Sequence, residues 1–372
     1  MGKFVEKRVK LVEIALVVAL AFGFLWIIPE KPAMASGSSA EIVLEQTSLR
    51  VLFARNEHLR LPNASTTKIV TAITVIEHTE NLDRVVAVPK VAVGTEGSSI
   101  YLTEGEKLTV RDLLCGLMLR SGNDAAVALA LHAGGSVSAF VAEMNERAEA
   151  LGLTQTHFEN PNGLDGERHY STARDMANLT AKAMKNPIFS EIVATKTYTV
   201  GKRCFQNHNR LLWTFNGAIG VKTGYTLAAG RTLVSAAQRD GRTLIAVTLR
   251  DRDDWNDHAA LYEYGFGLYG MQPVYEKNEE VTRLPLANGQ TAALLAGETV
   301  LLSLRDGERP DFEVRWPQLA MQAGTPGTHA GYAELRLGER VVATLPLLGG
   351  ESGLAYDGPT SKNNGCTGRG VP

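Results

Sequence analysis

Three short motifs place nucleophilic, basic and amide side chains where they can act together. The first is Ser65-Thr66-Thr67-Lys68. If Ser65 opens a helix, Lys68 lies one turn later on the same face, and the two side chains can meet. A serine hydroxyl is a weak nucleophile until a base takes its proton, and a lysine is such a base only when its amine is neutral. Burial and a second nearby cation would both lower the pKa of that lysine. Taken alone, the same letters also fit a helix cap followed by a surface lysine.

Two further motifs supply partners for this pair. Ser121-Gly122-Asn123 can turn a hydroxyl and an amide into a cleft, although it also suits a helix-ending turn. Lys222-Thr223-Gly224 fits a cationic strand whose glycine lets a substrate backbone lie alongside, although it also suits the start of an edge strand. Each triplet alone is common. The three in this order, each on the element type that the chemistry needs, predict one functional site.

The apolar periodicity predicts the elements that position these motifs. The run from Ile69 to Ile76 predicts a helix that Asn63 or Ser65 would cap, with Lys68 on its first turn. Further helices are expected at 108–119, 124–133, 140–151, 173–185 and 259–268. Strands are expected within 42–53 and at 220–226, 231–238 and 243–249, the middle two paired across a turn that contains glycine. Helices beside a sheet of paired strands predict an α/β (α+β) fold.

Length and composition limit the remaining possibilities. The chain has 372 residues, which is typical of two domains. Its formal net charge of -2 provides no positive field for nucleic acid. Three cysteines are too few for a disulfide framework, and no Cys-x-x-Cys pair is present to bind a metal. We therefore expect no metal, no cofactor and no nucleic-acid partner.

The chain divides into four segments by composition. Residues 1–35 predict an export signal, with a basic start, a run free of charge from Ile14 to Ile28, and Ala33-Met34-Ala35 before a cleavage point. An uncleaved membrane anchor is the alternative. Residues 36–270 contain all three motifs and form the expected catalytic domain. Short apolar runs separated by turn residues over 271–350 predict a small all-β sandwich. The tail 351–372 is rich in Gly, Ser and Asn, and this composition predicts a disordered segment without an amphipathic helix.

The motif set resembles that of penicillin-binding proteins and class A β-lactamases. Its surroundings resemble the low-molecular-mass D-alanyl-D-alanine carboxypeptidases, serine peptidase family S11. The similar stretches are Ala64–Lys68, Arg120–Ala125, Asn160–Leu164, His169–Asp175 and Gly220–Thr226. The likeness covers roughly residues 38–270, and the C-terminal β segment has the length and place of the family's second domain. The resemblance implies a penicillin-binding/β-lactamase-like transpeptidase fold and removal of the terminal D-alanine from peptidoglycan stem pentapeptides.

The resemblance also implies roles for the reacting groups. Ser65 would be the nucleophile and Lys68 its general base. Ser121 would relay a proton to the leaving group, and Asn123 would hold both the substrate amide and Lys68. β-Lactam antibiotics would acylate the same serine as covalent inhibitors.

The third motif would bind the substrate. Lys222 would supply positive potential and help to keep Lys68 neutral, and Thr223 would bind the terminal carboxylate of the peptide. The backbone N–H groups of Ser65 and Tyr225 would form the oxyanion hole. Gly224 would act sterically.

Several points stay open at this level. An arginine is expected near the end of the strand that follows the Lys-Thr-Gly strand, and Arg250 and Arg252 are both candidates for binding carboxylate. His208 is either a cleft residue or a structural loop histidine. Cys115 is expected to be a buried, inert thiol. The family's C-terminal amphipathic anchor is not evident, which leaves peripheral membrane association open.

Two other functions compete with the carboxypeptidase interpretation. A class A β-lactamase needs a Glu-x-x-Leu-Asn loop between the second and third motifs, and Phe158-Glu159-Asn160-Pro161 does not have that spacing. The appended β segment is also foreign to that class. A non-catalytic penicillin-binding sensor would have no need of the full set of reacting groups that this chain carries.

Overall fold

The computed structural model describes residues 37–285, 291–315, 322–323, 327, 329–350 and 354–355. The predicted export signal at 1–35 lies outside these residues, as does most of the predicted tail. Leu354 and Ala355 form β18, a two-residue strand paired with β15 (Gln322–Ala323), so these two residues differ from the disordered tail that the composition predicts.

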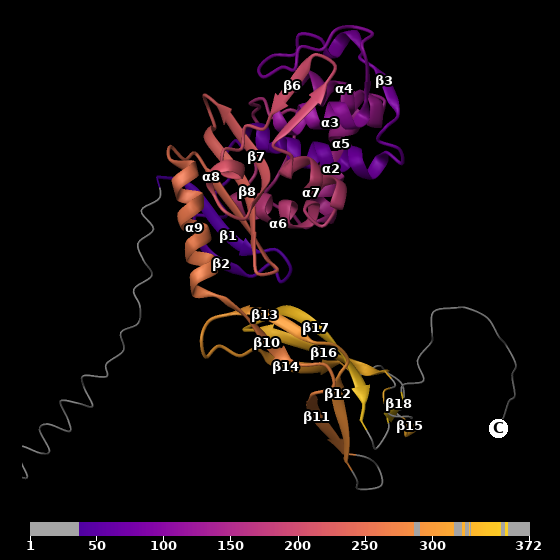
Figure 1. Cartoon of the computed structure of the whole chain (residues 1–372), viewed down its shortest axis with the longest axis vertical. Helices are drawn as coiled ribbons and strands as arrows, with labels where there is room; N and C mark the ends of the chain where they lie inside the picture. Colours follow the sequence, from indigo (N-terminus) through magenta and orange to yellow (C-terminus); the bar gives the residue numbers. More distant parts are fainter. Residues whose placement is uncertain are drawn as a thin grey trace, which may run out of the picture. The chain divides into compact units, whose positions relative to one another are not determined.

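A five-stranded antiparallel sheet organises the catalytic domain (Figure 1). Its order is β2-β1-β9-β8-β7. The strands are β1 (Ala40–Glu45), β2 (Val51–Arg55), β7 (Ala218–Thr226), β8 (Gly230–Arg239) and β9 (Arg242–Leu249). Every residue of β9 is buried, as expected for a central strand covered on both faces. β7 lies at one edge, so one side of its backbone is not used by the sheet.

Helices cover both faces of this sheet. α9 (Asp254–Leu268) contacts β8, β9 and β1, and Figure 1 shows it on the side opposite the main group of helices. That group contains α2 (Lys68–His78), α3 (Val110–Leu119), α4 (Asn123–Gly134), α5 (Val137–Ala150) and α6 (Ala173–Ala183). These helices and strands confirm the predicted α+β arrangement.

Local capping chemistry fixes where several helices begin. Thr109 and Asp112 form a reciprocal capping box at the start of α3, and Thr172 accepts from the N–H of Asp175 at the start of α6. The predicted cap at the first motif is wrong, because neither Asn63 nor Ser65 accepts a capping hydrogen bond there. Asn63 Nδ2 instead donates to Thr67 Oγ1 at 2.9 Å.

Several short elements were not predicted. They are η1 (Ala64–Thr67), β3 (Val85–Ala87), η2 (Lys90–Ala92), β4 (Lys107–Thr109), α7 (Pro187–Ala194), β5 (Thr197–Val200), β6 (Arg203–Gln206) and α8 (Leu211–Thr214). The start of α7 could have been predicted from the sequence, because Asn186 caps the helix and Pro187 occupies its first turn.

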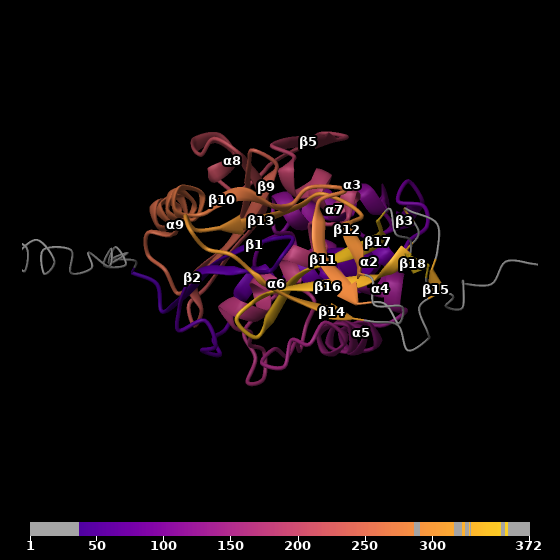
Figure 2. The same cartoon turned by 90° about the horizontal axis from the view of Figure 1, so that it is seen from below.

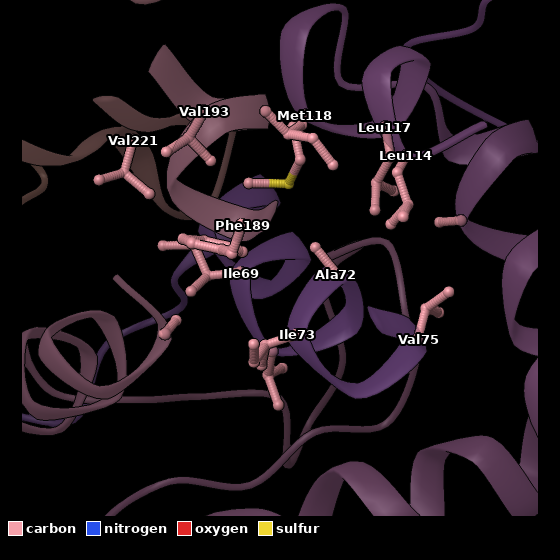
Figure 3. Packing of buried hydrophobic residues seen from close by; sticks show 14 of the residues in the cluster. Ile69, Ala72, Ile73, Val75, Leu114, Leu117, Met118, Phe189, Val193 and Val221 are labelled. Atoms are coloured by element: carbon pink, nitrogen blue, oxygen red, sulfur yellow. The ribbon is translucent and has the colours of Figure 1, made fainter. Parts of the chain in front are cut away.

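The catalytic core surrounds α2. Figure 3 shows Ile69, Ala72 and Ile73 of this helix among side chains of α3, α7 and β7, including Met118, Phe189 and Val221. Nine of the eleven residues of α2 are buried, so the helix that carries Lys68 is fixed on nearly all sides. This core draws its fully buried members from residues 40–249.

A separate β domain follows α9. Its main sheet has the order β11-β12-β17-β16-β14, visible as orange to yellow arrows in Figure 2. The strands are β11 (Glu280–Pro285), β12 (Thr291–Ala296), β14 (Asp311–Arg315), β16 (His329–Leu337) and β17 (Arg340–Gly349). A second pair consists of β10 (Gly270–Tyr275) and β13 (Val300–Leu304). Side chains from both sheets share one hydrophobic core, which agrees with the predicted C-terminal β domain.

Among the described helices, none alone is long and apolar enough to cross a bilayer. One pair, α4 with α5, passes on length and composition together and is bent by 84° at the break between the two helices.

Candidate active site

Ser65 lies on a tight turn directly before α2. It belongs to η1, and the preceding Ala64 has a φ of 48°, in the left-handed region that non-glycine residues seldom adopt. Lys68 is the first residue of α2, and its Nζ lies 2.9 Å from Ser65 Oγ. The predicted contact between these two side chains is confirmed.

Lys68 has two other hydrogen-bond partners. Its Nζ donates to Asn123 Oδ1 at 2.7 Å and to the backbone carbonyl of Asn162. Asn123 is the first residue of α4, so the second motif contacts the first as predicted. The carbonyl of Asn162 was not predicted, because a backbone atom leaves no mark on residue type.

Burial governs the charge of both lysines. Lys68 is fully buried, and this burial, followed by the charge of Lys222, holds its pKa well below the ordinary value, while Asp124 acts in the opposite direction. Lys222 is 1% exposed, and burial lowers its pKa to about 7. Lys68 therefore loses its proton more readily than an ordinary lysine, which is the condition for acting as a base.

A loop supports Asn123 from the other side. Asn123 Nδ2 donates to the carbonyl of Glu96 at 2.6 Å. The buried carboxylate of Asp124 accepts from the N–H groups of Ile100 and Leu102 and from Ser99 Oγ. The loop and the start of α4 are thus held as one unit, which fixes the Asn123 amide in front of Lys68.

The third motif lies on edge strand β7, beside the nucleophile. A Cβ atom on Gly224 would lie 2.3 Å from Thr232 Oγ1 and 3.0 Å from the backbone nitrogen of Ser65. Only glycine allows this approach, as the steric prediction for Gly224 requires. Lys222 Nζ donates to the carbonyl of Thr223 at 2.8 Å. Tyr225 is 63% exposed at the rim.

The motifs meet at a cleft of about 320 Å³. Five of the predicted residues line it, namely Ser65, Ser121, Thr223, Gly224 and Tyr225. Ser121 follows α3 with a φ of 61°, so a strained backbone presents this hydroxyl. Lys68, Asn123 and Lys222 lie buried behind these lining residues.

Five other lining residues were not assigned a role from the sequence. They are Ser98, His208, Arg231, Asp254 and Trp255. His208, for which the sequence allows either a cleft or a structural role, lines the cleft, where partial burial and the charges of Lys222 and Arg120 lower its pKa to about 4. It is therefore neutral near pH 7. Cys115 is buried, and burial raises the pKa of its thiol to about 12, as expected of an inert cysteine.

The arginine on the cleft is Arg231. It pairs through two nitrogens with Asp254, at 2.6 and 3.2 Å, and its guanidinium lies 5.6 Å from the ring centre of Trp255. Neither candidate from the sequence, Arg250 or Arg252, is among the residues lining this cleft. The hairpin register could have identified Arg231, because it pairs with Tyr225 directly across β7 and β8.

Comparisons with known proteins agree with this geometry. The family model for D-alanyl-D-alanine carboxypeptidase matches residues 27–253. D-alanyl-D-alanine carboxypeptidase DacF of Bacillus subtilis is 32% identical over 74% of each chain. D-alanyl-D-alanine carboxypeptidase DacC of Escherichia coli is 33% identical over 83% of this chain and 82% of its own.

One solved structure matches most of this chain. Penicillin-binding protein 5 of Haemophilus influenzae superposes with a TM-score of 0.71 at 25% identity, covering 86% of this chain and 98% of its own. A match over this share of both proteins extends beyond the catalytic domain into the β domain. Motifs, fold and relatives together place the chain in the D-alanyl-D-alanine carboxypeptidase family, the serine peptidases of family S11.

Proposed function

We propose that Ser65 attacks the peptide bond of substrates ending in D-Ala-D-Ala and forms an acyl-enzyme that water then hydrolyses. The observation that carries this proposal is the 2.9 Å contact between Ser65 Oγ and the fully buried Nζ of Lys68. A serine hydroxyl beside a lysine with a lowered pKa is an activated nucleophile, because the neutral amine can take its proton. Lys68 takes the proton of Ser65 as the new ester bond forms.

The remaining roles follow from position. The N–H groups of Ser65 and Tyr225 stabilise the oxyanion, which is why the close approach of Gly224 matters. Ser121 passes a proton to the leaving D-alanine nitrogen. Asn123 holds the substrate amide, and the free edge of β7 takes the peptide in an extended conformation.

The terminal carboxylate of the substrate is bound by Thr223 and Arg231, with Lys222 supplying positive potential from behind. Two nitrogens of Arg231 are held by Asp254, which fixes the guanidinium at the cleft. Arg231 replaces Arg250 and Arg252 in this role because it alone of the three lines the cleft.

We propose peptidoglycan stem pentapeptides as the substrate and β-lactams as covalent inhibitors of Ser65. Two features disfavour a β-lactamase. Glu159 does not line the cleft, and its carboxylate accepts from the backbone N–H of Arg168 at 3.1 Å, away from Ser65. The chain also carries the β domain. The sequence of residues 1–35, which predicts an export signal, supports the proposal that the protein works outside the cytoplasmic membrane.

One assay separates these functions. The purified protein is incubated with a fluorescent penicillin and, separately, with a D-alanyl-D-alanine pentapeptide. Slow release of the penicillin together with D-alanine production is expected. Fast penicillin hydrolysis would indicate a lactamase, and labelling without peptide turnover would indicate a sensor. Ser65→Ala is expected to abolish labelling and D-alanine release with the fold intact, because a half-buried hydroxyl carries little packing energy. Labelling of that variant at another serine would refute the assignment.

A further inference from the structure

The turn at residues 160–164 packs against the nucleophile. Gly163 has a φ of 87°, and a Cβ atom there would lie 2.0 Å from the carbonyl oxygen of Ala64. The turn is held from within by Asn160, whose Oδ1 accepts from the N–H groups of Gly163 at 2.7 Å and Leu164 at 3.1 Å. Asn160 Nδ2 donates back to the carbonyl of Leu164 at 2.9 Å.

The same turn is held from α2. Thr71 Oγ1 donates to the carbonyl of Pro161 at 2.6 Å, and Thr71 is fully buried. Pro161 directly precedes Asn162, whose carbonyl accepts from Lys68. The side chains of Asn160 and Thr71, which hold the backbone on either side of Asn162, therefore fix the direction of the Asn162 carbonyl oxygen.

Counting hydrogen-bond positions shows why that direction matters. A neutral lysine amine has two N–H groups and one lone pair. Its three polar neighbours are Asn123 Oδ1, the carbonyl of Asn162 and Ser65 Oγ. The first two only accept, so they take both N–H groups. The third position then holds the lone pair, and it faces the one neighbour that has a proton to give.

We infer that Asn160 and Thr71 are positioning residues for the general base: they hold the Asn162 carbonyl so that the lone pair of neutral Lys68 points at Ser65. This inference rests on the proposed acyl-enzyme chemistry at Ser65. It adds that an acceptor outside the three motifs orients the base, and that the 160–164 turn is conformationally restricted for that purpose.

The pH dependence of acylation distinguishes orientation from simple loosening. An acceptor stabilises an ammonium more than an amine, so losing the Asn162 carbonyl lowers the pKa of Lys68 further. If the turn only loosens and admits water, the pKa of Lys68 rises instead, because burial is the main cause of its lowered pKa. The acid limb is the part of the pH profile in which the acylation rate rises as Lys68 loses its proton. It therefore moves to lower pH if the Asn162 carbonyl is lost as an acceptor, and to higher pH if water enters the site.

The experiment measures acylation by a fluorescent penicillin across pH, by stopped flow, in the parent and in Asn160→Ala, Asn160→Asp and Thr71→Val. We expect the plateau rate to fall ~10-fold or more in Asn160→Ala and Thr71→Val, the scale of a misplaced reacting group, with the acid limb moved to lower pH. Asn160→Asp keeps an acceptor for both N–H groups but loses the donor to the Leu164 carbonyl. We therefore expect its plateau to lie between those of the parent and Asn160→Ala, and its charge to move the acid limb to higher pH.

Asn186→Ala is the matched control. Asn186 Oδ1 also accepts two backbone N–H groups, those of Ile188 and Phe189, but it caps α7 and does not line the cleft. We expect lower thermal stability and an unchanged acylation profile in this variant.

Three outcomes would overturn the inference. They are a parental plateau in both Asn160→Ala and Thr71→Val, a lower plateau with the acid limb moved to higher pH in Thr71→Val, and an Asn160→Asp plateau as low as that of Asn160→Ala. None of these is the outcome that refutes the proposed function, which is labelling that persists in Ser65→Ala. Thr71→Val keeps the side-chain shape, so the test remains decisive even if Asn160→Ala does not fold.

Discussion

Replacing Lys222 tests the electrostatic design of the cleft most directly. The productive state combines a neutral Lys68, which can take a proton, with a charged Lys222, which attracts the substrate carboxylate. Burial and the charge of Lys222 both lower the pKa of Lys68, against an opposing effect of Asp124, whereas burial lowers the pKa of Lys222 to about 7. We expect Lys68 to lose its proton first. Acylation should therefore rise with pH as Lys68 deprotonates and fall again near pH 7 as Lys222 loses its charge.

Lys222→Ala removes both effects of this charge. We expect acylation to fall by ~100-fold or more, the scale of one electrostatic catalytic group. The acid limb should move to higher pH, because the pKa of Lys68 rises when a neighbouring positive charge is gone. The falling limb near pH 7 should disappear, since the group that titrates there is missing.

Lys222→Arg is the matched variant. A guanidinium stays charged from pH 5 to pH 10. Measurable acylation should therefore remain, with its acid limb still at low pH, while the fall in rate near pH 7 is lost. The measurement is the second-order rate of penicillin acylation from pH 5 to pH 10 for all three proteins. If Lys222→Ala acylates as fast as the parent with an unshifted profile, Lys222 does not act in the site, and the assignment of the third motif must be withdrawn.

Three further changes test steric, recognition and folding features. Gly224→Ala should lower acylation ~100-fold, because the added methyl group meets Thr232 and the Ser65 nitrogen; parental labelling would show that the close approach is not required. Arg231→Gln should reduce the preference for a peptide with a free terminal carboxylate over its amide by ~10-fold or more, since a charge-assisted hydrogen bond is lost, and an unchanged preference would exclude Arg231 from recognition. A chain shortened to residues 36–270 should fold and bind penicillin, because the buried core around α2 lies within 40–249; a soluble but unlabelled product would contradict that boundary.

The contact between Ser65 and Lys68 could be predicted from the sequence because it follows from short-range geometry. A spacing of three residues puts Ser65 and Lys68 on one helical face whether the first turn is 3-10 or α, and the contact formed although the predicted cap did not. The helix after Gly122 places Asn123 at its first position for the same local reason. Short apolar runs bounded by turn residues likewise identified β8 and β9, the strands that support the third motif.

Other features could not be predicted, because they depend on pairs distant in the chain. The Asn162 carbonyl reaches Lys68 across 94 positions, and it is a backbone atom that any residue would supply. Arg231 differs from these features, because the register of the β7–β8 hairpin pairs it with nearby Tyr225 and makes it predictable; the expectation of an arginine after the next strand pointed to Arg250 and Arg252 instead. The role of Asp124 also depends on distant residues. Its carboxylate accepts from the N–H groups of Ile100 and Leu102, and these contacts form only when that loop packs against α4.

The pairing of β1 with β9 has a consequence for how the enzyme is made. Ala40 of the first strand aligns with Leu249 of the central strand, so about two hundred residues separate partners that must meet before the sheet is complete. Such non-local pairing is slow, and it cannot begin while the later partner is still inside the ribosome or the export channel. α2 can form early, but Ser65 meets Gly224 only after β7 has joined the sheet. A chain threaded through a membrane from its N-terminus would therefore cross without a finished catalytic centre and acquire its reactivity only on the far side.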